Sequence, residues 1–106
     1  MSVISFIAVV SVSTLLLASS TKAIAGNGAT LYKAKACQTC HGPDGKTPLL
    51  PAYPKIAGQN AEYLIQQITD IRDGQRSNGL SAAMKPMTSN LRDPEIKAIA
   101  NWLASQ

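Results

Sequence analysis

The residues most able to do chemistry in this 106-residue chain are gathered in one pentapeptide. Its two cysteines and its single histidine form the sequence Cys37-Gln38-Thr39-Cys40-His41. Two thiols three residues apart can reach the two vinyl groups at one edge of a porphyrin, and each then forms a thioether. The adjacent imidazole is held beneath the ring, where it can bind iron. The spacing therefore predicts one covalently bound haem c, with Cys37 and Cys40 as its anchors and His41 as an axial iron ligand.

Three other interpretations of the two cysteines are weaker. A disulfide across only two intervening residues would be strained. A thioredoxin-like dithiol normally follows a strand, whereas the flanks of this motif have helical character. A structural zinc site needs four ligands, and the chain has no further Cys or His to complete one. An isolated histidine is more often a plain core or surface residue, but its place directly after Cys40 favours a ligand.

The sixth coordination position of the iron decides what such a haem can do. A second histidine ligand is excluded because the chain has only one histidine. Met84 and Met87 lie close together before the C-terminal helix, and a thioether ligand opposite histidine raises the potential of a haem. Methionine also fills gaps in hydrophobic cores. The residues alone therefore leave three possibilities, namely Met84, Met87 and an open position.

The N-terminal quarter of the chain has the features of an export signal. Val3 to Ala18 is an apolar run interrupted only by serines and one threonine, and it is shorter than the roughly 20 residues of a membrane span. The segment Ala23-Ile24-Ala25 is typical of a cleavage site, although no Lys or Arg precedes the apolar run. We expect residues 1–25 to be a cleaved secretory signal and residues 26–106 to be the mature domain. The alternative is an uncleaved N-terminal anchor.

The remaining sequence predicts three main helices joined by loops, and therefore an all-α fold. Residues 28–36 form the first predicted helix, and residues 42–59 contain four prolines and are predicted to be a loop. Asn60 and Gly74 are suitable cap residues for a helix over 61–73. Residues 74–92 are predicted to be irregular. Asp93 is expected to cap the last helix, with Pro94 at its first position.

Size and charge limit the function further. A mature part of about 80 residues forms one domain, and domains this small usually need a disulfide, a metal or a cofactor to be stable. The formal charge is +4, or +3 without Lys22, since nine Lys and Arg then face six Asp and Glu. This excess gives no support for nucleic-acid binding, but it suits attraction to acidic redox partners or simple solubility. The lysines concerned are Lys33, Lys35, Lys46, Lys55 and Lys85.

The order of these segments resembles the class I cytochromes c, and most closely the short bacterial members or one half of the two-haem members. The similarity runs over residues 28–104 and includes the pentapeptide with Gly42 and the block Tyr-Pro-Lys-Ile-Ala-Gly-Gln at 53–59. Two features depart from the family pattern. One residue is inserted between Tyr32 and Cys37, and Arg92 replaces the usual serine before the last helix.

The resemblance implies a cytochrome c fold wrapped around one haem, and it assigns roles to several residues. In the family pattern the sixth iron ligand falls on Met84. A proline carbonyl accepts the hydrogen bond of the ligand histidine, which points to Pro54, with Pro51 as the alternative. The first and last helices pack together, so Tyr32 and Trp102 are expected to meet near Gly28. Three residues are candidates to approach the haem propionates: Gln59, Tyr63 and Arg76.

The implied function is one-electron transfer in the bacterial periplasm rather than catalysis. Two protein ligands on the iron leave no open position for oxygen or peroxide. The implied partners are redox proteins, with a terminal oxidase, a quinol-oxidising complex, a peroxidase and a dehydrogenase all possible. No nucleic acid and no stable membrane insertion after signal cleavage are expected. The competing function is a catalytic or gas-binding haem protein with an open sixth position.

Overall fold

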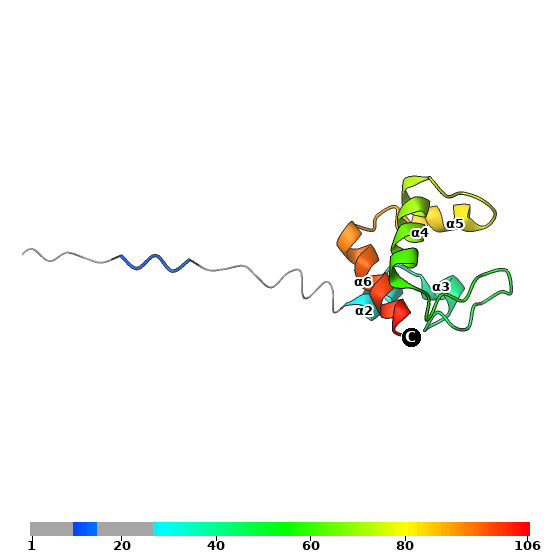
Figure 1. The fold of residues 1–106 in the computed structure, drawn as a ribbon, viewed down its shortest axis with the longest axis horizontal. Coiled ribbons are helices and arrows are strands. Elements are labelled where there is room, and N and C mark those ends of the chain that lie inside the picture. The colour runs from blue at the N-terminus through cyan, green and yellow to red at the C-terminus, as the bar shows by residue number, and fades with distance from the viewer. Residues whose placement is uncertain (1–9, 15–26) are drawn as a thin grey trace, which may run out of the picture.

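A computed structural model describes residues 10–14 and 27–106, and within them every regular element is a helix. Figure 1 shows the order of these elements, which are α2 (Gly28–Ala34), α3 (Gln38–His41), α4 (Ala61–Asp73), α5 (Ser81–Thr88) and α6 (Asp93–Ala104). The predicted all-α fold is therefore confirmed. None of the helices described has the length and apolar character needed to cross a membrane. Most of the predicted signal, residues 1–25, lies outside the described residues.

The N-terminal and C-terminal helices pack closely at Gly28. A Cβ atom at this position would overlap the carbonyl oxygen of Ala98 and lie 2.5 Å from Cβ of Trp102. Only glycine therefore allows α2 to approach α6 this closely. The rings of Tyr32 and Trp102 meet beside this contact, with centroids 5.0 Å apart and planes at 49°. The predicted pairing of these two aromatic residues is confirmed.

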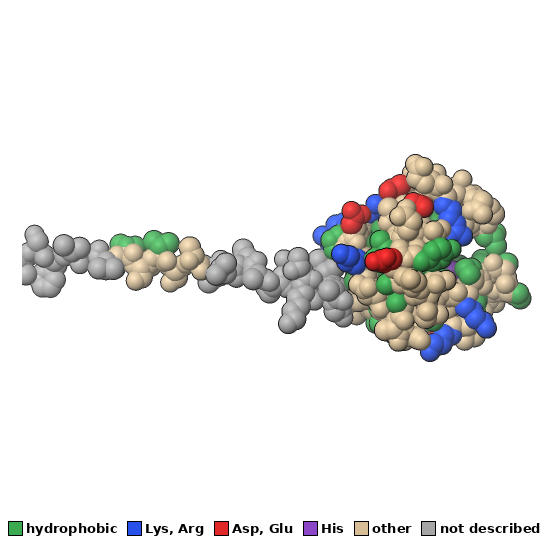
Figure 2. All heavy atoms as spheres, viewed as in Figure 1, with side chains coloured by type: hydrophobic (Ala, Val, Ile, Leu, Met, Phe, Trp, Pro, Cys, Tyr) green, Lys and Arg blue, Asp and Glu red, His purple; other side chains and the backbone are tan. Residues whose placement is uncertain are grey.

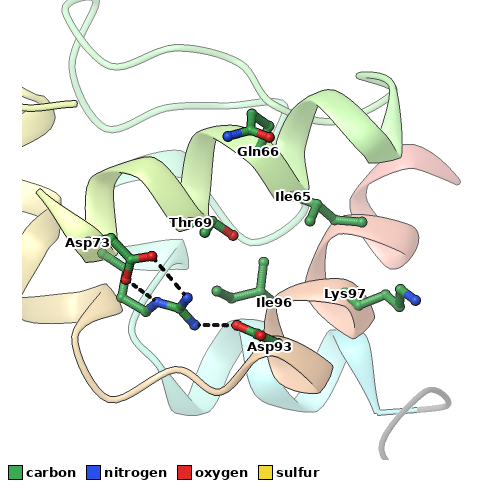
Figure 3. A pocket seen from close by; sticks show the side chains of 8 residues that line it. Ile65, Gln66, Thr69, Asp73, Asp93, Ile96 and Lys97 are labelled. Carbon is green, nitrogen blue, oxygen red and sulfur yellow. Dashed lines mark hydrogen bonds and ion pairs between the residues drawn. The ribbon is translucent and has the colours of Figure 1, made fainter. Parts of the chain in front are cut away.

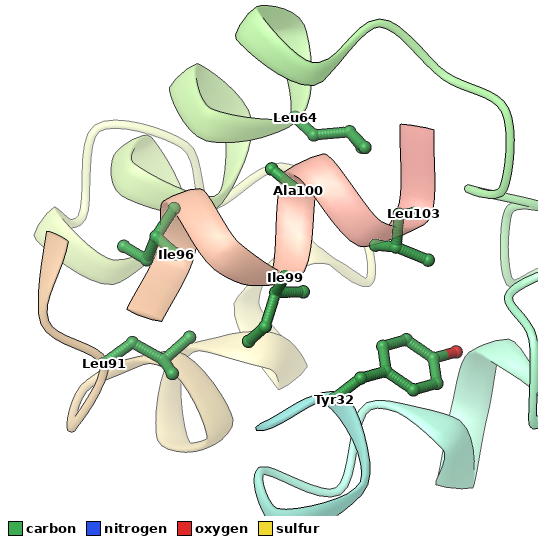
Figure 4. Packing of buried hydrophobic residues seen from close by; sticks show 7 residues of the cluster. All are labelled: Tyr32, Leu64, Leu91, Ile96, Ile99, Ala100 and Leu103. Carbon is green, nitrogen blue, oxygen red and sulfur yellow. The ribbon is translucent and has the colours of Figure 1, made fainter. Parts of the chain in front are cut away.

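The hydrophobic core lies around α6, which contacts α2 on one side and α4 on the other. Figure 4 shows the side chains of α6 directed toward Tyr32 from α2, Leu64 from α4 and Leu91 from the preceding connection. The buried members of this cluster are Tyr32, Leu64, Leu91, Ile96, Ile99, Ala100 and Leu103. Burial of such side chains contributes about 1.5–3 kcal/mol each. The core holds three helices together, and the partly buried Ile56 of the 42–59 segment packs against it.

The bounds of α4 agree with the predicted caps. The side-chain oxygen of Asn60 accepts a hydrogen bond from the backbone N–H of Glu62 at 3.0 Å, as an N-cap residue should. The helix ends at Gly74, which adopts a left-handed conformation with φ +81°. Of the three residues predicted to share the apolar face, Leu64 and Ile71 are buried and Ile68 is half-buried. The predicted loop over 42–59 is also confirmed, since it contains no helix or strand.

The first helix ends earlier than predicted. It stops at Ala34, and a turn at residues 35–37 follows instead of a continuous helix to residue 36. Ala36 has a left-handed conformation with φ +62°, which ends the helix and reverses the chain. The turn accommodates the residue inserted between Tyr32 and Cys37. The N–H of Cys37 donates a hydrogen bond to the Tyr32 carbonyl at 3.0 Å. Tyr32 thereby keeps its packing partner.

The prediction of an irregular segment over 74–92 was wrong, because α5 occupies Ser81–Thr88. Pro86 suggested a break in this region. In so short a helix, however, the missing N–H removes only one intrahelical bond, and the preceding Ala82, Ala83, Met84 and Lys85 all favour helix. Contact with α4 supplies further support.

The start of α6 also differs from the prediction. Arg92, not Asp93, is the N-cap residue, and Asp93 and Pro94 are the first two helical residues. A carboxylate oxygen of Glu95 accepts hydrogen bonds from the Arg92 backbone N–H at 3.0 Å and from its Nε at 3.1 Å. Asp93 lies inside the helix and does not cap it, and its carboxylate accepts a hydrogen bond from Arg72 at 2.7 Å.

Candidate functional site

The pentapeptide forms a single helical turn at the junction between α2 and the 42–59 loop. Cys37 is the N-cap residue of α3, and its carbonyl accepts hydrogen bonds from the N–H groups of Cys40 at 3.4 Å and His41 at 3.1 Å. Both cysteines are half-buried free thiols and form no disulfide. The local fold therefore brings the two thiols and the imidazole of the predicted site together on one turn.

His41 is buried, with 5% of its surface exposed. Its Nδ1 lies 3.0 Å from the carbonyl oxygen of Pro54. Because a carbonyl only accepts hydrogen bonds, Nδ1 must carry a proton, and in the neutral imidazole Nε2 then keeps its lone pair. The acceptor is the predicted Pro54 and not Pro51. This bond orients the ring and leaves one nitrogen available to a metal.

A hydrogen bond from α2 stabilises the turn after His41. The hydroxyl of Tyr32 donates a hydrogen bond to the carbonyl of Gly42 at 2.6 Å, and Tyr32 itself is fully buried. Burial, with a smaller effect from Cys37, raises the pKa of Tyr32 to about 12. The phenol is therefore protonated at neutral pH and remains a donor. Gly42 adopts φ +85°, and a Cβ there would overlap the carbonyl of Thr47, so glycine is required.

The environment of Cys37 does not suit a redox dithiol. Burial raises the pKa of its thiol to about 11, with the neighbouring Cys40 adding to the effect. A nucleophilic cysteine needs a lowered pKa, because the thiolate is the reactive form. The described residues also contain no group of three or more His, Cys, Asp or Glu side chains that could hold a metal ion.

The two candidate methionines both lie on α5, and they differ in exposure. Met84 is half-buried, whereas Met87 has 49% of its surface exposed. One residue that the sequence did not single out supports this helix: the buried Thr88, whose hydroxyl donates to the carbonyl of Met84 at 3.1 Å and of Lys85 at 3.2 Å. The sequence did contain a signal for this bond, because a threonine in a helix can donate to the carbonyl four residues before it, and Thr88 lies four residues after Met84.

Of the three residues expected to approach the haem propionates, two form hydrogen bonds with nearby residues and the third is half exposed. Nη1 of Arg76 donates to the side-chain oxygen of Gln67 at 2.8 Å, and Gln59 accepts from the N–H of Asn60 at 2.8 Å. Tyr63 is half exposed. Gln38 was not predicted to matter, yet its side-chain oxygen is buried within the pentapeptide and has no hydrogen-bond partner among the described residues.

This geometry agrees with the family whose model the sequence matches. The model for cytochrome c covers residues 25–106. The chain belongs to the cytochrome c family. Cytochrome c-554(548) from Halomonas halodenitrificans is 46% identical over 74 residues, which covers 70% of this chain and 88% of that protein. Cytochrome c4 from Pseudomonas aeruginosa is 43% identical over 74 residues, which covers 70% of this chain but only 35% of that protein.

The fold leads to the same family. The crystal structure of reduced recombinant cytochrome c4 from Pseudomonas stutzeri superposes with a TM-score of 0.68 and 30% sequence identity. The match covers 79% of this chain and 48% of that chain. The chain thus spans about one third to one half of the cytochrome c4 proteins that it matches, in accord with the expected likeness to one half of a two-haem protein.

A cytochrome c carries a covalently bound c-type haem with iron, and this chain is a c-type haem electron carrier. The residues present fit that cofactor. Two free thiols lie on one turn, and the neighbouring imidazole has one nitrogen held by Pro54 and the other available.

Proposed function

We propose that this protein is an exported one-electron carrier whose haem is attached through Cys37 and Cys40 and whose iron is bound by His41 and Met84. When bound, the haem supplies an iron that is reversibly oxidised and reduced by one electron. The single observation that carries the proposal is the 3.0 Å contact between Nδ1 of His41 and the Pro54 carbonyl.

In this proposal the chain acts on the cofactor by fixing its ligands. The Pro54 carbonyl sets the tautomer of His41, fixes the plane of the ring and increases the basicity of the remaining nitrogen. The hydrogen bond from Tyr32 to the Gly42 carbonyl holds the backbone immediately after the ligand. Ligands that do not move on reduction keep the reorganisation small, which favours rapid electron transfer.

The choice of Met84 over Met87 rests on burial and support. Met84 is the more buried of the two, and its backbone carbonyl accepts a hydrogen bond from the buried Thr88. Met87 is half exposed. A thioether opposite His41 would favour ferrous iron and fill the sixth position, so the protein would act as a carrier and not as an enzyme.

The surface suits docking to redox proteins. Figure 2 shows hydrophobic side chains gathered at the end of the domain formed by the 42–59 loop and α5, where Leu49, Leu50, Leu80 and Met87 are exposed. In the same view the acidic side chains lie over α4 and α6. Lys46 and Lys55 project from the loop, and both are exposed. This arrangement favours a partner with acidic residues around an apolar centre.

Five lysines were expected to steer partners, but they are not equivalent in the structure. Four of the five are exposed: Lys33, Lys46, Lys55 and Lys85. Lys35 is half-buried and lies 3.9 Å from the carboxylate of Glu95. We therefore assign Lys35 a structural role and assign the steering role to Lys33, Lys46 and Lys55, since the ammonium of Lys85 lies against the C-terminal turn of α4.

The partner class and the compartment complete the proposal. A relative from Stutzerimonas stutzeri, 40% identical over 70 residues that cover 31% of that protein, is a thiosulfate dehydrogenase electron acceptor. We propose a dehydrogenase as one electron donor for this chain. We also propose that residues 1–25 direct export to the periplasm and are then removed, which leaves the domain free of the membrane.

Three optical measurements on the purified holoprotein test this function. A redox titration should follow a one-electron curve. The oxidised protein should show the weak long-wavelength band of an iron–methionine bond, and the reduced protein should not bind carbon monoxide readily. Absence of the band together with rapid carbon monoxide binding would instead support the gas-binding or catalytic alternative.

A further inference from the structure

We propose that Arg72 is a positioning residue that holds α5, and with it Met84, through a path of hydrogen bonds from the end of α4. The assignment of Met84 as the iron ligand rests on the proposed function, but the support of α5 by Arg72 does not. Nothing in the sequence had singled out Arg72, because its partners are 19 and 21 residues away.

Arg72 binds groups on both sides of the gap between α4 and α6. Its Nη1 donates to the carbonyl of Leu91 at 3.1 Å and to the carboxylate of Asp93 at 2.7 Å. Its Nε donates to the neighbouring Asp73 at 2.8 Å. Figure 3 shows Asp73 on α4 and Asp93 at the start of α6 in the groove between the two helices, and Arg72, which also lines this groove, is paired with both. Only 18% of the arginine side chain is exposed.

The path continues from Leu91 to Met84. The N–H of Leu91 donates to the Thr88 carbonyl at 3.0 Å, and the Thr88 hydroxyl donates to the Met84 carbonyl at 3.1 Å. Leu91 and Thr88 are 5% and 4% exposed. Since the path is buried along these two residues, water competes weakly with its hydrogen bonds. Arg72 therefore fixes the connection that follows α5.

α5 needs such support because it is only eight residues long and contains Pro86. Helices this short are not stable alone in water. A second tie lies at the same end of α4: a Cβ on Gly74 would be 3.1 Å from Nζ of Lys85, so this ammonium lies against the C-terminal turn of α4. Lys85 and Arg72 together anchor α5 to the end of α4, where the helix dipole favours positive charge.

The test compares Arg72→Gln with Asp73→Asn in the holoprotein. Arg72→Gln removes the donors to Leu91 and Asp93, whereas Asp73→Asn keeps both of those bonds and removes a charge that lies beside Arg72 and Lys85. In Arg72→Gln we expect amide hydrogen exchange at Ser89 and Leu91 to be about tenfold faster, with α6 amides changed less than about twofold. Imidazole should also bind the oxidised iron about tenfold more tightly, because it displaces a less firmly held methionine. Asp73→Asn keeps the bonds to Leu91 and Asp93, so it should change both quantities by less than about twofold.

Arg72→Lys gives a second measurement should Arg72→Gln fail to fold. It keeps the charge but loses the planar fork, so it should show a smaller change of the same kind. Equal exchange at Ser89 and Leu91 in wild type and variant would overturn the proposal, and so would a uniform increase across all helices. If wild-type protein lacks the iron–methionine band, the ligand assignment fails, but the exchange data still decide the role of Arg72.

Discussion

The two ring nitrogens of His41 have different environments, and this difference is the basis of the site at the scale of single residues. One nitrogen is held by the Pro54 carbonyl at 3.0 Å inside a buried turn, and the other has no hydrogen-bond partner among the residues that the structure describes. The pentapeptide alone predicted the ligand, and the family resemblance supplied its acceptor. Gln38 and Thr88 escaped prediction because their significance depends on burial, which no local pattern reveals.

Replacement of each methionine separately tests the second ligand. Met84→Ala should abolish the long-wavelength iron–methionine band of the oxidised protein and open the iron to carbon monoxide after reduction. Met87→Ala should leave both properties unchanged, because that side chain is half exposed. The measurement is the visible absorption spectrum of the two purified variants. The reverse pattern would transfer the ligand role to Met87.

Glu95 gives a prediction for the dependence of stability on pH. The backbone N–H of Arg92 is the largest cause that holds the pKa of this carboxyl below its ordinary value of 4.5, and the guanidinium of Arg92 and Lys35 add to it. Because the folded pKa is lowered, the stabilisation is complete above about pH 4.5 and is lost as the pH falls through the folded value. Glu95→Gln should therefore unfold more easily than wild type at pH 7, and the difference should shrink below pH 4.5.

Denaturant unfolding of the holoprotein between pH 7 and pH 3 measures this difference. Glu62→Gln is the matched control, since Glu62 is exposed in the first turn of α4 and forms no ion pair among the residues described. A gap between Glu95→Gln and wild type that stayed constant over the whole range would contradict the linkage.

The ends of a helix could be predicted from the sequence where a single cap residue determines them. Asn60 and Gly74 predicted both ends of α4, because a cap acts through its own side chain or its own φ angle. Prediction failed where packing decides. Pro86 led to the prediction of an irregular segment despite the helix-forming residues around it. In the fold, contact with α4 stabilises α5. Asp93 does not cap α6 because the helix already includes it, and its carboxylate instead binds the distant Arg72.

The close approach of α2 and α6 gives a sharp test at this scale. Gly28→Ala would introduce a methyl group that overlaps the Ala98 carbonyl and lies 2.5 Å from Cβ of Trp102. Neither group can move without separating the helices, so we expect a loss of about 3 kcal/mol in the free energy of unfolding. Thr30→Ala changes an exposed position on the same helix and should alter stability by less than about 0.5 kcal/mol. Equal stabilities for the two variants would refute this packing account.

At the scale of the whole molecule, the buried core is small and centred on α6. The 42–59 loop and α5 lie at the edge of this core, and several of their apolar side chains are exposed in the protein chain alone. A haem between these segments would supply the missing apolar contacts, as cofactors commonly do in small domains. The need for a cofactor could be inferred from length and composition, whereas the arrangement of its supports could not.

Protein without haem should therefore lose much of its structure. The double variant Cys37→Ser/Cys40→Ser, purified without haem, should show much weaker helical circular dichroism than the holoprotein and should unfold without a cooperative transition. Native-like helical signal with a cooperative transition would show that the protein core is sufficient without the cofactor.

The mass of the intact protein under denaturing conditions tests whether Cys37 and Cys40 anchor a haem. We expect a single species that begins at Gly26 and carries the mass of one covalently attached haem. Cys37→Ser and Cys40→Ser should each leave the haem joined by only one thioether. A wild-type mass equal to the polypeptide alone would contradict the assignment of these two cysteines as haem anchors.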